Sequence, residues 1–404
     1  MESVLVIGGG ASGLMAALTA AEDENRRVTL LERQQRVGRK LLSTGNGRCN
    51  LTNLAASSPA HYHGADPAFV LPALRELPPT ETLALFRSFG LLTVTEDSGR
   101  VYPLSDSASS VLDVLRFQIA QRGVELKTAS PARALRREGG RFLVELDGEA
   151  LTADALIVAC GGAAGAKLGG VSDGYELLRP LGHRRTALYP ALVQLVTEPD
   201  YPRALKGVRA DAALSLRRGR ERLAEAEGEL QFTERGVSGP AVFELSRAAA
   251  AGGEGLKLHA DFLRTYGPEN VEAMLSERVR TLPGLEASEL LTGLLHNRLG
   301  KMLLKYSGVE LKRPVGTLRP NELRHVAAAC KDFALPVRGT EGFDQAQVTA
   351  GGLRTADFDP RTLQSRLCPG LYVCGELLDI DGDCGGYNLQ WAWASGRLAG
   401  RLLR

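Results

Sequence analysis

The sequence predicts an α/β fold whose first unit binds a dinucleotide, and three observations near the N-terminus support this. An apolar run, Ser3 to Ile7, leads without a spacer into a glycine-rich turn, and an alanine-rich helical segment, 14–21, follows directly. A second apolar run, Val28 to Glu32, comes next and ends in an acid. This order of strand, turn, helix and acid-ended strand is typical of a βαβ unit in a mostly parallel sheet.

The glycine-rich turn has the spacing G-x-G-x-x-G, with glycines at positions 8, 10 and 13. Gly8 permits the tight turn, Gly10 lets a pyrophosphate approach the backbone, and Gly13 allows the helix to pack closely on the strand. The phosphates are expected on the free amides at the helix N-terminus, and Glu32 is placed to accept hydrogen bonds from a ribose diol. The alternative is a glycine turn in an ordinary α/β unit.

Residues up to 190 continue with alternating strand and helix patterns, as a mostly parallel sheet requires. Ser109 and Ser110 are expected to cap an amphipathic helix over 111–122, and a strand is expected at 124–128. Glycine turns then separate three strand-like runs, which predict a small antiparallel meander over 132–136, 142–146 and 155–158.

The pattern changes after residue 190 and indicates an inserted domain, part sheet and part helix. Strands are expected at 192–196, 212–216 and 229–232, and helices over 268–337. The clearest helix carries a periodic leucine set, with Ser288 as its cap: Leu290, Leu291, Leu294, Leu295 and Leu299. The dinucleotide-binding unit is expected to resume with a strand over 370–376 and a closing helix over 388–404.

Composition argues against several classes of protein. The 49 basic and 47 acidic residues give a formal net charge of +2, too balanced for a dedicated nucleic-acid or membrane surface. No apolar run approaches the roughly 18 residues of a membrane span. The strand at the N-terminus leaves no room for a signal peptide, so a cytoplasmic location is expected. The six scattered cysteines lack paired C-x-x-C spacing and indicate neither a zinc site nor a disulfide framework.

Two further segments have the character of a cofactor site. Residues 38–50 contain a loop of small hydrogen-bonding residues, suited to a phosphate chain or a ring system, beside three cations: Arg39, Lys40 and Arg48. In residues 375–390, Glu376 can hold a polyol chain, and the amides that open the last helix, 385–388, can face negative charge on a reduced flavin. The alternatives are a basic surface loop and an acidic turn before a helix cap.

These three segments together resemble the bacterial aminoacetone-oxidase-like (BaiN/YhiN-type) family of FAD-binding proteins, a branch of the glutathione-reductase-like class. The resemblance also includes 232–240 in the insert and 347–352 where the chain returns, so it runs nearly end to end. It implies non-covalently bound FAD in a discontinuous Rossmann-like domain, a β-barrel-like insert and a small helical domain. The corresponding boundaries are 1–190 with 346–404, 191–265 with 338–345, and 266–337.

Carried over position by position, the resemblance implies cofactor contacts in all three segments. The adenosine and pyrophosphate side takes Gly8, Gly10, Ala11, Ser12, Gly13, Glu32, Arg33, Arg39, Lys40 and the backbone of Ala132. The flavin and ribitol side takes Asn46, Gly47, Arg48, Cys49, Asn50, Gly375, Glu376, Gly386, Asn388 and Leu389. Ala159 and Gly161 end a strand that touches the FAD backbone. The loop that follows this strand is shorter and richer in alanine than is usual in the family.

A second nucleotide fingerprint at 161–165 is not favoured. No second acid-ended strand follows at the usual distance, and Pro180 interrupts the space that such a unit needs. NAD(P)H is therefore expected only as a transient reductant of the flavin. Substrate is expected between the FAD domain and the insert, since domain interfaces often form pockets. The candidates for its wall are Thr233, Ser238, Thr349 and Tyr387.

The sequence thus predicts an FAD-dependent oxidoreductase that transfers hydride between flavin N5 and a small or medium organic substrate. Reduction of an activated C=C bond and amine oxidation by oxygen both remain open. A flavin-dependent tRNA-modifying protein and a flavin sensor are further alternatives, but the basic run at 216–222 also contains glutamate and indicates an exposed hairpin. No catalytic residue and no metal site is assigned.

Two pairs of side chains near the cofactor segments have alternative interpretations. Cys49 and Cys384 form a conceivable thiol pair, although Cys49 is implied only as a cofactor neighbour. His61 and His63 can act as general acids, but a mobile surface loop is the preferred interpretation of their segment.

Overall fold

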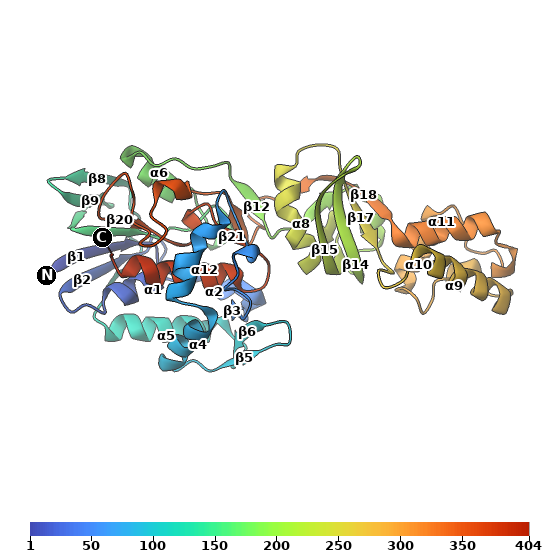
Figure 1. Cartoon of the computed structure of the whole chain (residues 1–404), viewed down its shortest axis with the longest axis horizontal. Coiled ribbons are helices and arrows are strands. Elements are labelled where there is room, and N and C mark those ends of the chain that lie inside the picture. Colours follow the sequence, from blue (N-terminus) through green and yellow to red (C-terminus); the bar gives the residue numbers. More distant parts are fainter. Residues whose placement is uncertain (404) are drawn as a thin grey trace. The chain divides into compact units, whose positions relative to one another are not determined.

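The computed structural model of the protein describes residues 1–403, which divide into two compact units (Figure 1). Unit 1 comprises Met1–Tyr189 with Ala346–Arg404, and unit 2 comprises Pro190–Gln345. The chain therefore leaves unit 1 once and returns to it, so the predicted discontinuous Rossmann-type fold is confirmed.

A five-stranded parallel sheet forms the centre of unit 1. Its strands follow the order β20 (Leu371–Val373), β11 (Ala155–Val158), β1 (Glu2–Ile7), β2 (Arg26–Leu31) and β7 (Glu125–Lys127). All four residues of β11 are buried, as expected for an inner strand of a parallel sheet. Because β20 comes from the returning segment, both parts of the chain are needed to complete the sheet.

Helix α1 (Ala11–Ala20) packs against the sheet and against the last helix, α12 (Tyr387–Gly400). Small residues of α12 allow this close approach. A Cβ on Gly396 would overlap the carbonyl oxygen of Ser12, and one on Gly400 would lie 2.6 Å from that of Ala16. The other helices of unit 1 are α2 (Arg39–Ser43), α3 (Leu71–Glu76), α4 (Pro79–Ser88), α5 (Ala108–Gln121) and α6 (Asp173–Leu178).

The antiparallel meander of unit 1 consists of β8 (Ala134–Glu138), β9 (Arg141–Glu145) and β10 (Ala150–Ala153). The assignment of 155–158 as its third strand was wrong, because these residues form β11 of the central sheet. Two smaller sheets lie near the cofactor segments. One contains β3 (Thr52–Asn53), β6 (Arg100–Pro103) and β5 (Thr93–Thr95), and the other pairs β4 (Tyr62–His63) with β21 (Asp381–Gly382).

Two helices begin at positions other than those predicted. Helix α5 begins at Ala108 after Ser107, so Ser109 and Ser110 lie inside its first turn and not at its cap. The leucine set does not form one helix. Residues 290–295 form turns closed by an isolated bridge between Thr292 and Leu295, and Gly293 has a φ of +83°. Helix α10 (Asn297–Tyr306) begins only after His296, whose side chain accepts from the Arg298 amide. Leu290 and Leu291 are buried by tertiary packing, and this burial explains why the leucine set has a helix-like spacing although no helix forms there.

Unit 2 contains a closed six-stranded barrel, which confirms the β-barrel-like insert. Its strands follow the order β13 (Leu195–Thr197), β16 (Gly236–Ser238), β15 (Glu221–Phe232), β14 (Arg209–Arg218), β17 (Leu256–Asp261) and β18 (Phe333–Thr340). The accompanying helices are α7 (Asp200–Ala204), α8 (Pro240–Ala251), α9 (Pro268–Thr281), α10 and α11 (Pro320–Lys331). Barrel and helices share one hydrophobic core, which includes Phe333, Leu303 and Val326.

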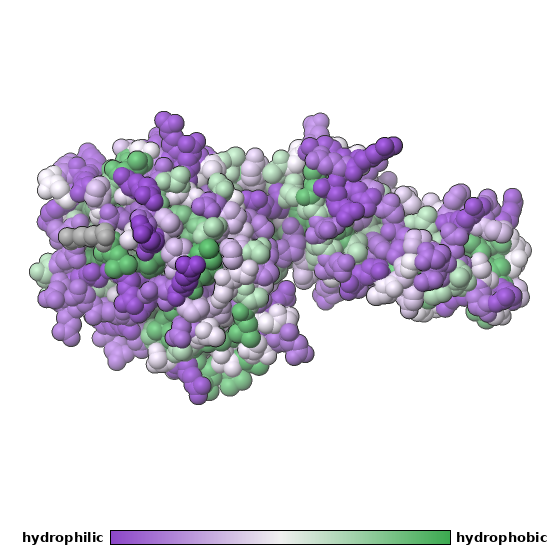
Figure 2. Space-filling view, in the orientation of Figure 1, coloured by the Kyte–Doolittle hydropathy of each residue, from purple (hydrophilic) through white to green (hydrophobic). Residues whose placement is uncertain are grey.

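The basic run at 216–222 lies on the β14–β15 hairpin, as predicted. Charges of both signs alternate on this hairpin. Arg222 pairs with Glu225, and Arg264 from the loop after β17 pairs with Asp211 and Glu227. The visible face of unit 2 is largely hydrophilic (Figure 2), and basic side chains of the hairpin region pair with acidic ones.

Candidate functional site

In the glycine turn between β1 and α1, two of the three glycines leave no room for a side chain, and the third has free space beside it. Gly8 has a φ of +112°, and a Cβ there would overlap the Ala159 carbonyl oxygen. A Cβ on Gly13 would overlap the carbonyl oxygen of Gly8. Gly10 has an ordinary φ of −82° and meets nothing within 4 Å, and α1 begins directly after it without a side-chain cap. The open backbone at a helix N-terminus is suited to a pyrophosphate.

Glu32 lies at the end of β2, directly beside this turn. Its Oε2 accepts a hydrogen bond from the Gly9 amide at 2.8 Å, and its Oε1 accepts one from the Gln34 amide at 2.7 Å. Each carboxylate oxygen retains a second lone pair that can accept from a ribose hydroxyl. The neighbouring Arg33 pairs with Asp173 at 3.4 Å.

Lys40, Glu376 and Thr349 come from three distant segments and meet in one hydrogen-bonded group. Lys40 Nζ lies 2.7 Å from Glu376 Oε2, and Glu376 Oε1 accepts from the Thr349 amide at 2.8 Å. The Thr349 hydroxyl accepts from the amide of Ala164 at 2.9 Å. The second and third cofactor segments are therefore joined through charge-assisted bonds, together with the loop that follows β11.

The loop of residues 44–50 contains several left-handed backbone conformations. Asn46 has a φ of +57° and Cys49 one of +60°, conformations that non-glycine residues adopt at a cost. The side-chain oxygen of Asn50 is buried and has no hydrogen-bond partner. It faces Gly386, where a Cβ would lie 2.9 Å from it. A bound ring system with an N–H donor would satisfy this acceptor, so the residues present fit a flavin.

Cys49 is completely buried in this loop, and burial raises the pKa of its thiol to about 12 despite an opposing hydrogen bond with Thr44. A thiol in this state is a poor nucleophile at neutral pH. The structure therefore supports Cys49 as a packing neighbour of the site. Cys384 is half-buried, and neither cysteine forms a disulfide bond.

Helix α12 holds the second and third segments together through buried polar side chains. Trp391 Nε1 donates to the Gly375 carbonyl at 3.1 Å, and Trp393 Nε1 donates to the Leu51 carbonyl at 2.9 Å. The Asn388 side chain accepts from the Gly382 amide at 2.8 Å and donates to the same residue's carbonyl at 2.7 Å. The Asn388 side chain is thus engaged within the protein, which leaves its backbone for the predicted cofactor contact.

His61 and His63 form a cluster with Asp383 that the sequence interpretation missed. His61 Nδ1 lies 2.9 Å from Asp383 Oδ2, and His63 Nε2 lies 2.7 Å from Asp383 Oδ1. His61 ends a short 3-10 helix and His63 belongs to strand β4, so the segment is not the irregular loop that the sequence suggested. Burial raises the pKa of the Asp383 carboxyl, but hydrogen bonds from His63 and His61 outweigh it and leave that pKa lowered. The H-x-H spacing is the sequence feature that could have revealed this cluster, because alternate residues of a strand share one face.

The four predicted substrate contacts are divided between the two units. Thr349 and Tyr387 lie in unit 1, where Thr349 is completely buried. Thr233 and Ser238 lie in the barrel of unit 2, where the Thr233 hydroxyl is buried without a partner. Two further predicted cofactor residues, Arg39 and Arg48, contact Gln34 and Asp106.

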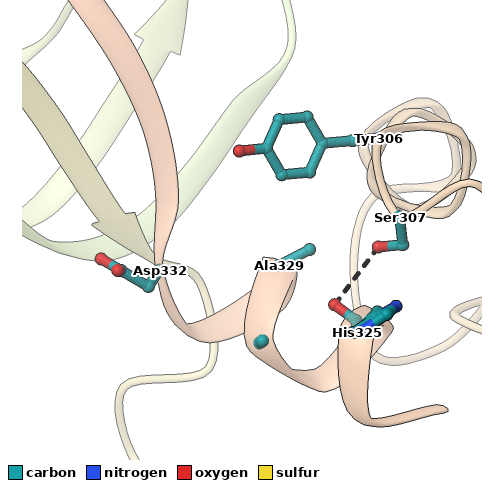
Figure 3. A pocket seen from close by; sticks show the side chains of 6 residues that line it. Tyr306, Ser307, His325, Ala329 and Asp332 are labelled. Carbon is teal, nitrogen blue, oxygen red and sulfur yellow. Dashed lines mark hydrogen bonds between the residues drawn. The ribbon is translucent and has the colours of Figure 1, made fainter. Parts of the chain in front are cut away.

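Unit 2 also has a cavity of its own, of about 320 Å³, beside α10 and α11. Its lining comprises Tyr306, Ser307, His325, Ala328, Ala329 and Asp332. Figure 3 shows the Tyr306 ring projecting over Ala329, and Ser307 donating to the His325 carbonyl. Asp332 is already paired with His259 at 2.8 Å. None of the predicted site residues lines this cavity.

Among residues 1–403, no helix combines the length and the hydrophobicity that a membrane span requires.

Comparison with known proteins finds relatives that match the whole chain. The model of the HI0933-like protein Rossmann domain family matches residues 2–402. A 3-dehydro-bile acid delta(4,6)-reductase of Clostridium scindens is 42% identical over 99% of this chain and 98% of its own length. Ribosomal RNA dihydrouridine synthases of Escherichia coli and Haemophilus influenzae are 29% and 28% identical over 97% of this chain and 95% and 96% of their own lengths.

Proposed function

The chain belongs to the HI0933-like family of Rossmann-domain proteins, and from this premise we propose that it reduces a carbon–carbon double bond conjugated to a carbonyl group. The protein is an FAD-dependent oxidoreductase. The observation that supports the finer assignment is its 42% identity, over 99% of the chain, to a protein named as a bile acid delta(4,6)-reductase.

The names of the two kinds of relative describe similar chemistry. A 3-dehydro-delta(4,6) bile acid has double bonds conjugated with a ketone, and uridine has a ring double bond conjugated with a carbonyl. In both, reduction adds a hydride and a proton across an activated C=C bond. Because relatives of both kinds match this chain nearly end to end, we assign this reaction class to it.

The residues of unit 1 have distinct tasks in this proposal. The backbone at Gly10 to Ser12 binds the pyrophosphate, and Glu32 binds the adenosine ribose. The Lys40–Glu376 pair, 2.7 Å apart, orients the chain between the phosphates and the ring system. Asn50 accepts a hydrogen bond from the ring edge. When FAD is bound, its N5 atom supplies the hydride.

We assign NAD(P)H as the external reductant, because this reaction consumes a hydride at every turnover. The loop after β11 supports this transient role. The Ala164 amide of this loop donates to the Thr349 hydroxyl, and Ala159 before the loop approaches Gly8 of the glycine turn. These contacts support the interpretation of residues 161–165 as part of the first dinucleotide site.

The substrate class we favour is a medium-sized enone, since the most similar of the relatives named above is a bile acid reductase. Ribosomal RNA is the second candidate, supported by relatives at 29% and 28% identity. The nearly balanced net charge of +2 argues against RNA as the substrate, because nucleic-acid binding relies on an excess of basic residues.

Anaerobic mixing of the purified holoenzyme with its reaction partners tests the proposal. We expect NADH or NADPH to bleach the flavin, and a 3-oxo-4-ene steroid to restore its colour while gaining two hydrogens. Uridine-containing ribosomal RNA is the parallel acceptor, and its reduction in place of the steroid would select the second candidate. If neither acceptor restores the colour, and an amine bleaches the flavin where the nicotinamides do not, the protein is an amine oxidase and the proposal fails.

A further inference from the structure

His61, His63 and Asp383 form the histidine–aspartate cluster, and no cofactor contact is assigned to any of them. We propose that this cluster donates the proton that completes the reduction of the double bond, an inference that rests on the proposed reductase function. The two imidazoles act as the acid, and Asp383 is a positioning residue that holds them.

Backbone pairing places the three side chains together. Strands β4 and β21 are antiparallel, with His63 opposite Asp381, and the Asp383 amide donates to the His61 carbonyl at 2.9 Å. The Asp383 carboxylate consequently lies between the two rings, at 2.9 Å from His61 Nδ1 and 2.7 Å from His63 Nε2. Each oxygen of the carboxylate bonds a different imidazole.

The cluster contacts the first residues of α12, a segment that is predicted to contact the flavin. The His61 ring stacks on Tyr387, the first residue of that helix, with ring centroids 4.4 Å apart and planes inclined by 24°. The Asn388 side chain donates to the Asp383 carbonyl at 3.3 Å. The same two residues that open α12 therefore position the cluster, so that the acid and the proposed ring site share one rigid support.

The cluster has the chemistry of a rechargeable acid. The carboxylate bridges the two imidazoles and fixes the orientation of both rings, and imidazole is the side chain best suited to proton exchange near neutral pH. The two histidine side chains are 33% and 39% exposed, so a donated proton can be replaced from water. Titratable groups near the rings include Tyr387, which stacks on His61, Asp381 on the facing strand, and Asp379, which accepts from the Ala65 amide.

The proton and electron balance is complete with the groups already named. The β-carbon of the substrate accepts the hydride from flavin N5, and its α-carbon accepts the proton from the imidazolium. The C=C π bond breaks and two C–H bonds form, while NAD(P)H restores the hydride and water restores the proton. A positioned acid of this kind typically contributes a factor of about 10² to 10⁴ in rate.

Four variants test the assignment: His61→Gln, His63→Gln, the double variant and, as a matched control, His259→Gln. His259 also pairs with an aspartate, Asp332 at 2.8 Å, but lies in unit 2. We expect all four to retain wild-type flavin content, visible spectrum and bleaching by NAD(P)H. We expect ferricyanide, which takes electrons without protonation at carbon, to reoxidise all of them at the wild-type rate. Steroid-dependent reoxidation should fall about 100-fold in the double variant and stay unchanged in the control.

Carbethoxylation of the histidine rings adds a readout that does not depend on turnover. The saturated ketone product should protect His61 and His63 of the loaded wild-type protein, as measured by peptide mass spectrometry, and leave His259 equally labelled. Loss of flavin from the variants, or wild-type steroid reduction by the double variant, would overturn the acid role while leaving the reductase function intact. Failure of the wild-type protein to reduce the steroid or the RNA would instead reject the reductase function, and the acid role with it.

Discussion

Replacement of Gly10 by valine is expected to give a folded but colourless protein. The backbone at Gly10 has a φ of −82° and a ψ of −172°, which valine adopts readily, and a Cβ there meets nothing within 4 Å. Folding should therefore proceed normally. The added side chain, however, occupies the space in front of the α1 N-terminus where the pyrophosphate is expected. We expect FAD affinity to fall at least about 100-fold, a loss of about 2.7 kcal/mol.

The flavin-to-protein ratio after purification, and FAD titration of the apo-protein, measure this effect. Gly284→Val is a matched control, because a Cβ at Gly284 also meets nothing within 4 Å and its backbone lies outside the left-handed region. The control should purify with full flavin content and an unchanged melting temperature. A yellow Gly10→Val protein with wild-type flavin content would refute the assignment of the pyrophosphate to this turn.

Gly13→Ala should prevent unit 1 from folding, although it adds only one carbon. That carbon would overlap the Gly8 carbonyl oxygen and lie 3.0 Å from its carbon and 3.3 Å from Ala159 Cβ. Two of these atoms are backbone atoms within the strand–turn–helix unit, so they cannot move without separating α1 from β1. We expect a loss of at least about 3 kcal/mol, a large fraction of the stability of an ordinary domain.

Soluble yield and thermal unfolding by circular dichroism measure this loss. Gly10→Ala, three residues earlier in the same turn, serves as the control and should melt like the wild type. A Gly13→Ala protein with an unchanged melting temperature would show that α1 does not pack on the turn as closely as the structure has it. We thus expect Gly13 to be needed for folding and Gly10 for binding of the cofactor.

Local sequence patterns predicted the parts of the fold that depend on neighbouring residues. The strand, turn and helix at 3–21 were predictable because each residue type there has a local steric or periodic reason. The third strand of the meander was not, because 150–153 alternates only weakly while 155–158 is uniformly apolar. The leucine set at 290–299 has helical spacing, but Gly293 interrupts it and tertiary burial supplies the periodicity.

In the candidate site, too, features formed by neighbouring residues were predictable, and contacts between distant residues were not. The glycine turn and its flanking strands were recognisable from spacing alone. The Lys40–Glu376 pair spans 336 residues and the His61–Asp383 pair spans 322, so no spacing rule connects their partners. Only the pairing of β4 with β21 shows that the H-x-H segment faces Asp383.

A crystal structure of the protein grown with FAD tests most directly whether the three segments form one cofactor site. We expect the pyrophosphate against the backbone of Gly10 to Ser12, the adenosine ribose at Glu32, and the ring system between the loop of residues 44–50 and the start of α12. In that complex the buried oxygen of Asn50 should gain a hydrogen-bond donor from the ring. FAD bound elsewhere on the protein, with these segments bare and Asn50 still unpaired, would contradict the assignment.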